Sequence, residues 1–259
     1  MDSAERDPVT ISVVTATHDC AVELPNLIDS LRAQSDRDFE WVVADGASSD
    51  RTLELLRAIS DIRMVISSQP DFGIYDALNR ALNSASGRYY IVAGADDRFA
   101  SDAIANFRRA IEQHRADVVA ANVLYGRHVF KIKRLPSWVV GEKAFIANHS
   151  IGTAFRRDLH AKFGWYSKKF PIAADSLFVL RACKGGATRY EGEFLAGRIG
   201  CSGVSYADWA GAATELFRVQ LLLGCALIPQ LLLLLLRVLK GSNARMRSLH
   251  EAILRKGPA

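Results

Sequence analysis

The chain has 259 residues, of which 49% are hydrophobic, 24% charged and 9% aromatic. This composition is typical of a globular protein and supplies enough apolar residues for one large α/β domain or two small ones. The formal net charge is only +5, so charge gives no argument for a nucleic-acid partner, and none is expected.

Residues 1–9 are polar and acidic, lack the features of a signal peptide, and are interpreted as an N-terminal tail. The cysteines show neither a CxxC pair nor the spacing of a metal site; they are Cys20, Cys183, Cys201 and Cys225. Reduced thiols in a cytosolic protein are therefore expected.

From residue 11 to residue 93, short apolar runs alternate with segments whose apolar residues have helical spacing. The pattern predicts strands at 11–14, 41–44, 63–66, 89–93 and 117–121, and helices at 24–31, 50–59, 73–85 and 101–114. Asp50 and Ser101 are expected to cap the helices that they begin. Such alternation with short links indicates an α/β fold with a mostly parallel sheet, right-handed crossovers and flanking helices.

Polar clusters follow the first four predicted strands, at the point where each strand ends. They are Thr15–Asp19, Asp45–Asp50, Gln69–Gly73 and Gly94–Asp97. In open parallel sheets, ligands bind beyond the carboxyl ends of the strands. We therefore expect one cleft to collect all four clusters.

Two adjacent carboxylates, Asp96 and Asp97, come directly after an apolar strand in the stretch YIVAGADDRF. A solvated turn is one interpretation, because Asp is common in turns. A divalent cation is the other, since it would offset the repulsion between the two acids. Mg²⁺ and Mn²⁺ prefer carboxylate and phosphate oxygens and often bind through one or two carboxylates plus a substrate diphosphate.

Residues 219–236, VQLLLGCALIPQLLLLLL, form an uncharged run. A straight helix of this length would measure roughly 27 Å, against about 30 Å for a bilayer core, and Pro229 is expected to interrupt it. Three alternatives remain: a helix pair lying in a membrane interface, a hydrophobic helix packed on the domain, and a membrane span. Basic residues favour the first; they are Arg237, Lys240, Arg245, Arg247, Arg255 and Lys256.

Several segments together resemble a family 2 glycosyltransferase with the GT-A fold. These are ISVVTATHDC with ADGASSD, QPDFGIYDALN with VAGADD, NHSIGTAF with PIAADSLF, and GCSGVS. They occur in the family's order and cover about residues 10 to 205. The GIYDAxN run is similar to that of bacterial exopolysaccharide transferases of the colanic-acid type.

The resemblance implies roles for individual residues on the donor side. Asp96 falls on the metal-binding acid of the family's Asp-x-Asp motif, with Asp97 beside it as a helper. Asp45 falls on the uridine-binding acid. The remaining positions hold the base or line the nucleotide–diphosphate side: Thr15, Thr17, Asp71, Gly73 and Asn79.

On the acceptor side, Asp175 falls on the family's catalytic base and His149 on a position near the acceptor. From the residues alone, a helix cap is the favoured interpretation of Asp175, a role that is compatible with a base, and a satisfied core histidine is the favoured interpretation of His149. The chain departs from the family at Gly94 and Gly46, where acids are common. The metal motif is thus reduced to Asp96 and Asp97.

The implied activity is inverting transfer of a sugar from a nucleoside-diphosphate sugar, expected to be UDP-linked, to an acceptor hydroxyl with Mg²⁺ or Mn²⁺. The acceptor would be a saccharide or a lipid-linked molecule in cell-surface polysaccharide or glycolipid synthesis. The expected organisation is a transferase domain, 10–210, with donor half 10–121 and acceptor half 122–210. Residues 211–259 would form a hydrophobic helical segment, peripheral on the cytoplasmic face of the inner membrane.

Two alternatives remain beside a glycosyltransferase. A nucleotidyltransferase would carry a Gly-rich loop with a basic residue after the first strand, where this chain has TATHDC. A scaffold of a polysaccharide assembly complex with a degenerate site is compatible with Gly46 and Gly94.

Overall fold

The computed structural model describes residues 11–147, 150–200 and 208–256, with side chains as far as residue 242. Its centre is a nine-stranded sheet in the order β3-β2-β1-β4-β8-β6-β9-β5, with β7 paired to β6. The first-half strands are β1 (Ile11–Thr17), β2 (Phe39–Asp45), β3 (Met64–Ser68) and β4 (Tyr89–Val92). They pair in parallel, with Val13 opposite both Trp41 and Ile91, which confirms the sequence prediction.

The second half extends the same sheet. Its strands are β5 (Arg98–Phe99), β6 (Val118–Tyr125), β7 (His128–Phe130), β8 (Thr153–Arg156) and β9 (Arg189–Arg198). Strand β8 is antiparallel to both of its neighbours, β4 and β6, so β6 and β9 run in the same direction as β1–β4. The sheet is therefore mixed, although most of its strands share one direction.

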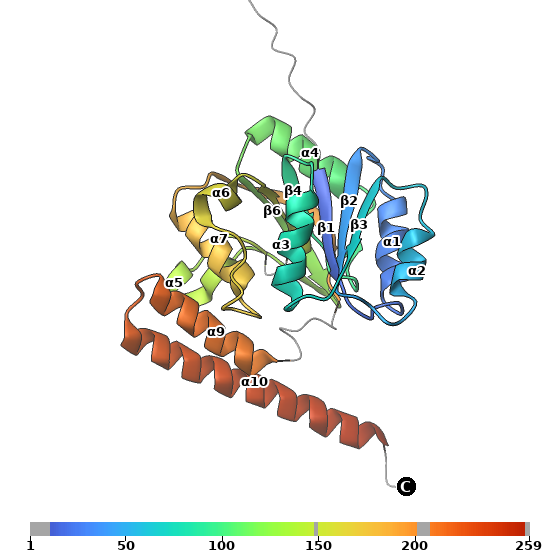
Figure 1. Cartoon of the computed structure of the whole chain (residues 1–259). Coiled ribbons are helices and arrows are strands. Elements are labelled where there is room, and N and C mark those ends of the chain that lie inside the picture. The colour runs from blue at the N-terminus through green and yellow to red at the C-terminus, as the bar shows by residue number, and fades with distance from the viewer. Residues whose placement is uncertain (1–10, 148–149, 201–207, 257–259) are drawn as a thin grey trace, which may run out of the picture.

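Helices cover both faces of the sheet and give three layers (Figure 1). Helices α1 (Leu24–Arg32), α2 (Thr52–Arg57) and α4 (Ala103–His114) pack with Ile11 and Val13 of β1 on one face. Helices α3 (Ile74–Ser84), α6 (Leu159–Phe163) and α7 (Ala174–Lys184) pack with Val14 on the other. Alternate residues of a buried strand face opposite layers, which explains its nearly continuous apolar run.

Two predicted helix starts differ from the structure. Helix α2 begins at Thr52, and the Asp50 carboxylate accepts hydrogen bonds from the backbone N–H groups of Thr52 and Ala21, both at 2.9 Å. The Asp50 carboxylate thus links the loop after β1 to the loop before α2 and also accepts from the first N–H group of α2. The prediction for Ser101 is wrong, because α4 begins only at Ala103.

The C-terminal segment forms a helical hairpin of α9 (Trp209–Leu222) and α10 (Leu227–Lys256), which lies along one end of the domain (Figure 1). The hydrophobic run breaks at Gly224, which has φ +81°, and not at Pro229 as the sequence predicted. Pro229 instead lies in the first turn of α10, where its missing N–H has no intrahelical partner to lose.

Long polar side chains attach the hairpin to the short helix α5 (Ser137–Val140). Gln220, Gln230 and Arg237 donate to the carbonyl oxygens of three consecutive residues, Ser137 to Val139, at 2.7, 2.7 and 2.8 Å. After α5 come two 3₁₀ turns, Gly141–Ala144 and Ser150–Gly152. Within the described residues, none of the helices combines the length and hydropathy that a bilayer crossing requires.

A buried carboxylate supports the start of β4. Glu40, 1% exposed, accepts hydrogen bonds at one oxygen from the Ser12 hydroxyl (2.6 Å) and from the backbone N–H groups of Ser86 (2.6 Å) and Gly87 (3.1 Å). Burial opposes its ionisation, but these hydrogen bonds prevail and lower the pKa of Glu40 below its ordinary value of 4.5.

Replacing Glu40 by Ala is expected to lower the free energy of unfolding by about 3 kcal/mol, because two backbone N–H groups and a hydroxyl lose their acceptor. Glu40→Gln keeps the accepting oxygen and is expected to cost about 1 kcal/mol. Urea unfolding measures both, with the exposed Glu112→Ala as the control.

The pH dependence of stability adds a second test of Glu40. Because the folded chain lowers the pKa of this carboxyl, its contribution is complete above pH 4.5 and is lost as the pH falls through the folded pKa. Between pH 5 and the pH of acid unfolding, the free energy of unfolding should therefore fall less in Glu40→Gln than in the parent. Identical acid sensitivity would contradict the assignment.

Candidate active site

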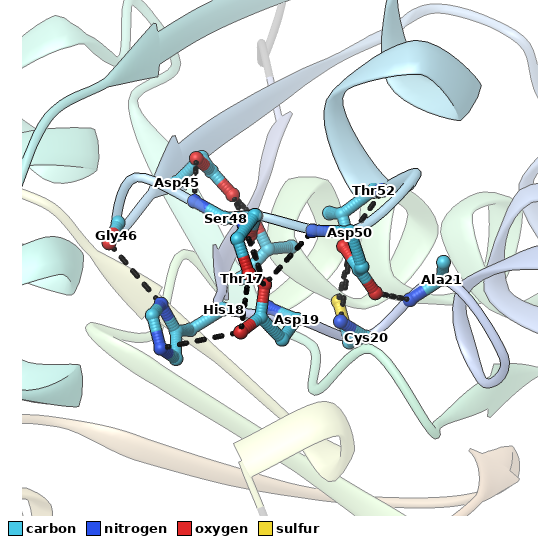
Figure 2. A network of polar contacts seen from close by, with 11 residues as sticks. Thr17, His18, Asp19, Cys20, Ala21, Asp45, Gly46, Ser48, Asp50 and Thr52 are labelled. Atoms are coloured by element: carbon cyan, nitrogen blue, oxygen red, sulfur yellow. Dashed lines mark hydrogen bonds and ion pairs between the residues drawn. The ribbon is translucent and has the colours of Figure 1, made fainter.

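The carboxyl ends of β1 and β2 meet in a dense polar network (Figure 2). The Asp45 carboxylate is fully buried and accepts from the hydroxyls of Thr17 (3.0 Å) and Ser68 (2.7 Å), and from both the hydroxyl and the N–H of Ser48. Burial opposes ionisation of Asp45, but these donors outweigh it and lower its pKa. Asp45 therefore uses its full accepting capacity to organise the loop that follows β2.

The loops after β1 and β2 also bind each other directly (Figure 2). Asp19 accepts from the N–H groups of Ser49 (2.7 Å) and Asp50 (3.2 Å), and these bonds lower its pKa. His18 Nδ1 lies 3.1 Å from the carbonyl oxygen of Gly46. Contacts between side chains of one loop and backbone groups of the other thus hold the two loops together.

Asp71, from the loop after β3, joins this edge. A Cβ atom built on Gly46 would lie 2.7 Å from Asp71 Oδ2 and 3.3 Å from His18 Nδ1. The space that a side chain at position 46 would need is therefore occupied by the Asp71 carboxylate. Asp71 also accepts from the N–H of Gly73 (2.9 Å), whose φ of +103° turns the chain into α3. The structure thus places Asp71 and Gly73 beside Gly46, the residue that follows Asp45.

Two predicted donor-side residues face elsewhere. The Thr15 hydroxyl is buried and accepts from the indole N–H of Trp41 at 2.9 Å. Asn79 donates to the carbonyl of Tyr166 (2.8 Å) and accepts from its N–H (3.1 Å). In this structure Thr15 is a core residue, and Asn79 joins α3 to the segment that precedes α7.

The adjacent acids after β4 differ in surroundings. Asp97 is fully buried, and its two oxygens accept from the N–H groups of Gly94 (2.7 Å) and Gly200 (3.1 Å). Asp96 is half-buried and packs against Gly200, where a Cβ would be too close to its carboxylate. Asp97 thus stabilises the turn, and Asp96 is the better-placed metal ligand.

No group of three or more His, Cys, Asp or Glu side chains that could hold a metal ion occurs among the described residues. The hard carboxylate oxygens of Asp96 nevertheless suit Mg²⁺ or Mn²⁺, which can bind through one carboxylate when substrate phosphate oxygens complete the shell. The residues present therefore fit a metal that shares its coordination with a diphosphate.

Asp175 lies in the first turn of α7, whose N-cap is Ala173, so Asp175 is not the helix cap that the residues alone suggested. Its Oδ1 accepts from the Tyr75 hydroxyl (2.8 Å) and from the N–H of Ser176 (2.7 Å). Burial, reinforced by the charge of Asp175, raises the pKa of Tyr75 well above its ordinary value, so the phenol keeps its proton and donates it. Tyr75 was missed by sequence reasoning, although it lies inside the GIYDAxN run.

A second carboxylate holds the segment before Asp175. Glu215 of α9 is 7% exposed and accepts from the N–H groups of Ile172 (2.9 Å) and Ala173 (2.8 Å), immediately before α7. The Tyr75 hydroxyl also lies 2.9 Å from the carbonyl oxygen of Ile172. The hairpin and α3 therefore position the turn that presents Asp175. His149, the predicted acceptor-side residue, lies outside the described residues, as does the Gly-Val-Ser element.

A family model described as "Glycosyl transferase family 2" matches residues 12–179. The chain is 31% identical over 192 residues to a PGL/p-HBAD biosynthesis glycosyltransferase of Mycobacterium bovis BCG, covering 69% of this chain and 72% of that protein. It is 29% identical over 185 residues to an uncharacterized glycosyltransferase of Mycobacterium tuberculosis, covering 67% and 68%. Neither relative bears out the finer likeness to colanic-acid-type transferases.

Among solved structures, the fold is similar to that of S. aureus TarS 1–349 in complex with UDP. The TM-score is 0.66 at 18% identity, covering 87% of this chain and 69% of that one. It is also similar to the mannosyltransferase PcManGT from Pyrobaculum calidifontis in complex with GDP-Man and Mn²⁺. That TM-score is 0.64 at 22% identity, covering 81% and 62%. These likenesses support the GT-A-like α/β fold.

Substituting Glu215 by Ala is expected to lower the free energy of unfolding by about 2–3 kcal/mol, because two buried N–H groups lose their acceptor. The amides of Ile172 and Ala173 should then exchange hydrogen faster than in the parent. Glu215→Gln retains an accepting oxygen and serves as the matched control. Parent-like exchange at both amides in the Ala variant would show that Glu215 does not hold this turn.

Proposed function

The chain belongs to glycosyl transferase family 2, and we propose that it transfers a sugar from a nucleoside-diphosphate sugar to an acceptor hydroxyl with inversion of the anomeric centre. The observation that carries this proposal is the placement of Asp175. Its carboxylate is oriented by Tyr75, which lies two residues after the Gly73 turn of the nucleotide-side loop. Helix α3, which begins directly after Gly73 and carries Tyr75, thus connects the proposed donor edge to the proposed base.

For the donor, we propose that the edge formed by Asp71 and His18 contacts the nucleoside and that Asp45 acts by holding this edge in place. The solved TarS and PcManGT structures contain UDP and GDP-Man respectively. A UDP-sugar remains our proposal for this chain. The donor half would be 10–121 and the acceptor half 122–210.

For the metal, we propose that Asp96 binds Mg²⁺ or Mn²⁺ together with the donor diphosphate, while Asp97 keeps the turn in place. A divalent cation held there would offset the charge that develops on the diphosphate leaving group. Because one carboxylate supplies the protein's share of the ligands, metal and nucleotide should bind cooperatively.

In the proposed reaction, Asp175 takes the proton of the acceptor hydroxyl. The acceptor oxygen forms a bond to the anomeric carbon as the bond from that carbon to the diphosphate oxygen breaks. Attack from the face opposite the diphosphate inverts the centre, so no covalent glycosyl-enzyme is required. The Tyr75 hydroxyl and the Ser176 N–H both donate to Asp175 Oδ1, which orients the carboxylate for this transfer.

For the location, we propose that the hairpin lies on the cytoplasmic face of a membrane and that the acceptor is lipid-linked or belongs to a growing saccharide. The support is an apolar stripe along α10 with large exposed side chains at helical spacing: Leu227, Ile228, Leu231, Leu232, Leu235, Leu236 and Leu239. The basic residues that follow it in sequence suit an anionic surface. This arrangement is compatible with cell-surface polysaccharide or glycolipid synthesis.

Asp175→Asn is expected to lower kcat by about 10²- to 10⁴-fold, the usual contribution of a general base. Donor affinity should stay within about twofold of the parent, because no direct contact of Asp175 with the nucleotide is proposed. Transfer is measured with UDP-sugars, and binding by calorimetry. Asp102→Asn, at the exposed position just before α4, is the control. Turnover at the parent rate would overturn the assignment of Asp175 as the base, whereas a parent without any transfer activity would favour the scaffold alternative.

Asp96→Ala is expected to abolish the Mn²⁺-dependent part of UDP affinity and to leave the metal-free affinity unchanged, because only the metal's carboxylate is removed. Calorimetry with UDP, with and without Mn²⁺, measures the difference. Asp97→Asn is the companion variant: it should lower the melting temperature by weakening the bonds to Gly94 and Gly200. If Mn²⁺ strengthens UDP binding equally in Asp96→Ala and the parent, the metal lies elsewhere.

A further inference from the structure

A basic and apolar groove opens between α7, α9 and the loop before α7, separate from the strand-end cleft. Its volume is about 720 Å³. Apolar side chains and cations line it together: Lys169, Phe170, Leu177, Arg181, Arg218 and Leu222. None of the lining residues belongs to the four strand-end clusters, so the groove is not part of the donor edge.

The charge in this groove has one sign. No carboxylate lines it, and within the described part of the chain Lys169, Arg181 and Arg218 form no ion pair. The Arg218 guanidinium lies over the ring of Phe170, 5.0 Å from its centroid, which holds one cation against the apolar wall. Two guanidinium groups and an ammonium around one opening match the oxygens of a phosphate.

The apolar side of the groove continues onto the hairpin. Leu222 lines the groove and is itself 57% exposed, and Leu227 and Ile228, at 53% and 71%, begin α10 directly after the turn at Gly224. A ligand that fills the groove would therefore meet cations at one end and an exposed apolar surface at the other. That combination fits an amphiphile better than a free anion.

We propose that this groove binds the phosphate of an anionic membrane lipid, with the acyl chains directed along the apolar stripe of α10. The inference rests on the membrane location given above and deepens it, because it replaces diffuse attraction by a defined headgroup site. Leu177 and Arg181 belong to the helix whose first turn carries Asp175. An occupied groove would thus anchor the base-bearing helix to the membrane.

The test uses a lipid that stays monomeric, so that surface charge alone cannot produce binding. Dihexanoylphosphatidylglycerol, below its micelle concentration, is titrated into the full-length protein by calorimetry. We expect saturable binding of one lipid per chain, weakened at least about tenfold in Lys169→Gln/Arg181→Gln/Arg218→Gln. The control, Arg57→Gln/Arg109→Gln/Lys131→Gln, loses the same charge from exposed positions and should bind like the parent.

Two further probes identify the source of the phosphate. Dihexanoylphosphatidylcholine should bind more weakly than the glycerol lipid, because its headgroup has no net charge. Inorganic phosphate that binds as tightly as the lipid would overturn the lipid assignment in favour of a free-anion site. Equal lipid affinity in the groove variant and the parent would show that the lipid does not bind in this groove.

Vesicle flotation separates this inference from the membrane proposal. Leu231→Gln/Leu235→Gln removes part of the exposed stripe and leaves the groove residues intact. The membrane proposal holds if the parent floats with phosphatidylglycerol vesicles and the stripe variant does not. If the groove variant then binds monomeric lipid as tightly as the parent, the hairpin associates with membranes but the groove is not a headgroup site. If the parent fails to float at all, the membrane location fails as well. UDP affinity of every variant serves as the check of folding.

Discussion

One recurring interaction holds the turns of this structure in place: a buried carboxylate that accepts hydrogen bonds from backbone N–H groups, most of them distant in sequence. Glu40 does this at the start of β4, Asp97 between the ends of β4 and β9, and Glu215 at the start of α7. A buried charge is costly unless it is hydrogen-bonded, and bonds to an ionised acceptor are among the strongest. Glu40 lies at the amino ends of β1 and β2, whereas Asp97 and Glu215 hold the turns next to Asp96 and Asp175.

The same interaction divides the acids of the cleft into two kinds. Asp45 and Asp97 are fully buried and committed to loop and turn geometry, whereas Asp71, Asp96 and Asp175 are half-buried. Asp96 and Asp97 are adjacent and have identical side chains, but they belong to different kinds, because Asp97 is fully buried and accepts from the N–H groups of Gly94 and Gly200, whereas Asp96 is half-buried. In the proposed mechanism the second kind carries the chemistry and the first kind positions it.

Sequence periodicity was sufficient to predict β1–β4 and the helices between them, because each element buries a regular apolar face. It missed β8 (Thr153–Arg156), which is short and enters the sheet antiparallel through tertiary contacts alone. The break in the hydrophobic run was placed at Pro229, since helix propensity does not distinguish a proline in a first turn from one that ends a helix. The motifs located the acids of the site, but Thr15 and Asn79 show that a motif position does not determine where a side chain points.

The two glycines at which the chain departs from its family have different physical consequences. At Gly46, a side chain would enter the space of Asp71, so the loop after β3 supplies a carboxylate close to where the family commonly carries one. At Gly94, a Cβ would lie 2.9 Å from Asp96 Oδ1 and 3.3 Å from Asp97 Oδ2, and a third acid there would add repulsion that only a bound cation could offset. The first departure therefore keeps a carboxylate at the proposed nucleotide edge, whereas the second lowers the negative charge of the proposed metal edge. For the proposed metal, this difference predicts a weaker intrinsic affinity that recovers when the diphosphate brings its own oxygens.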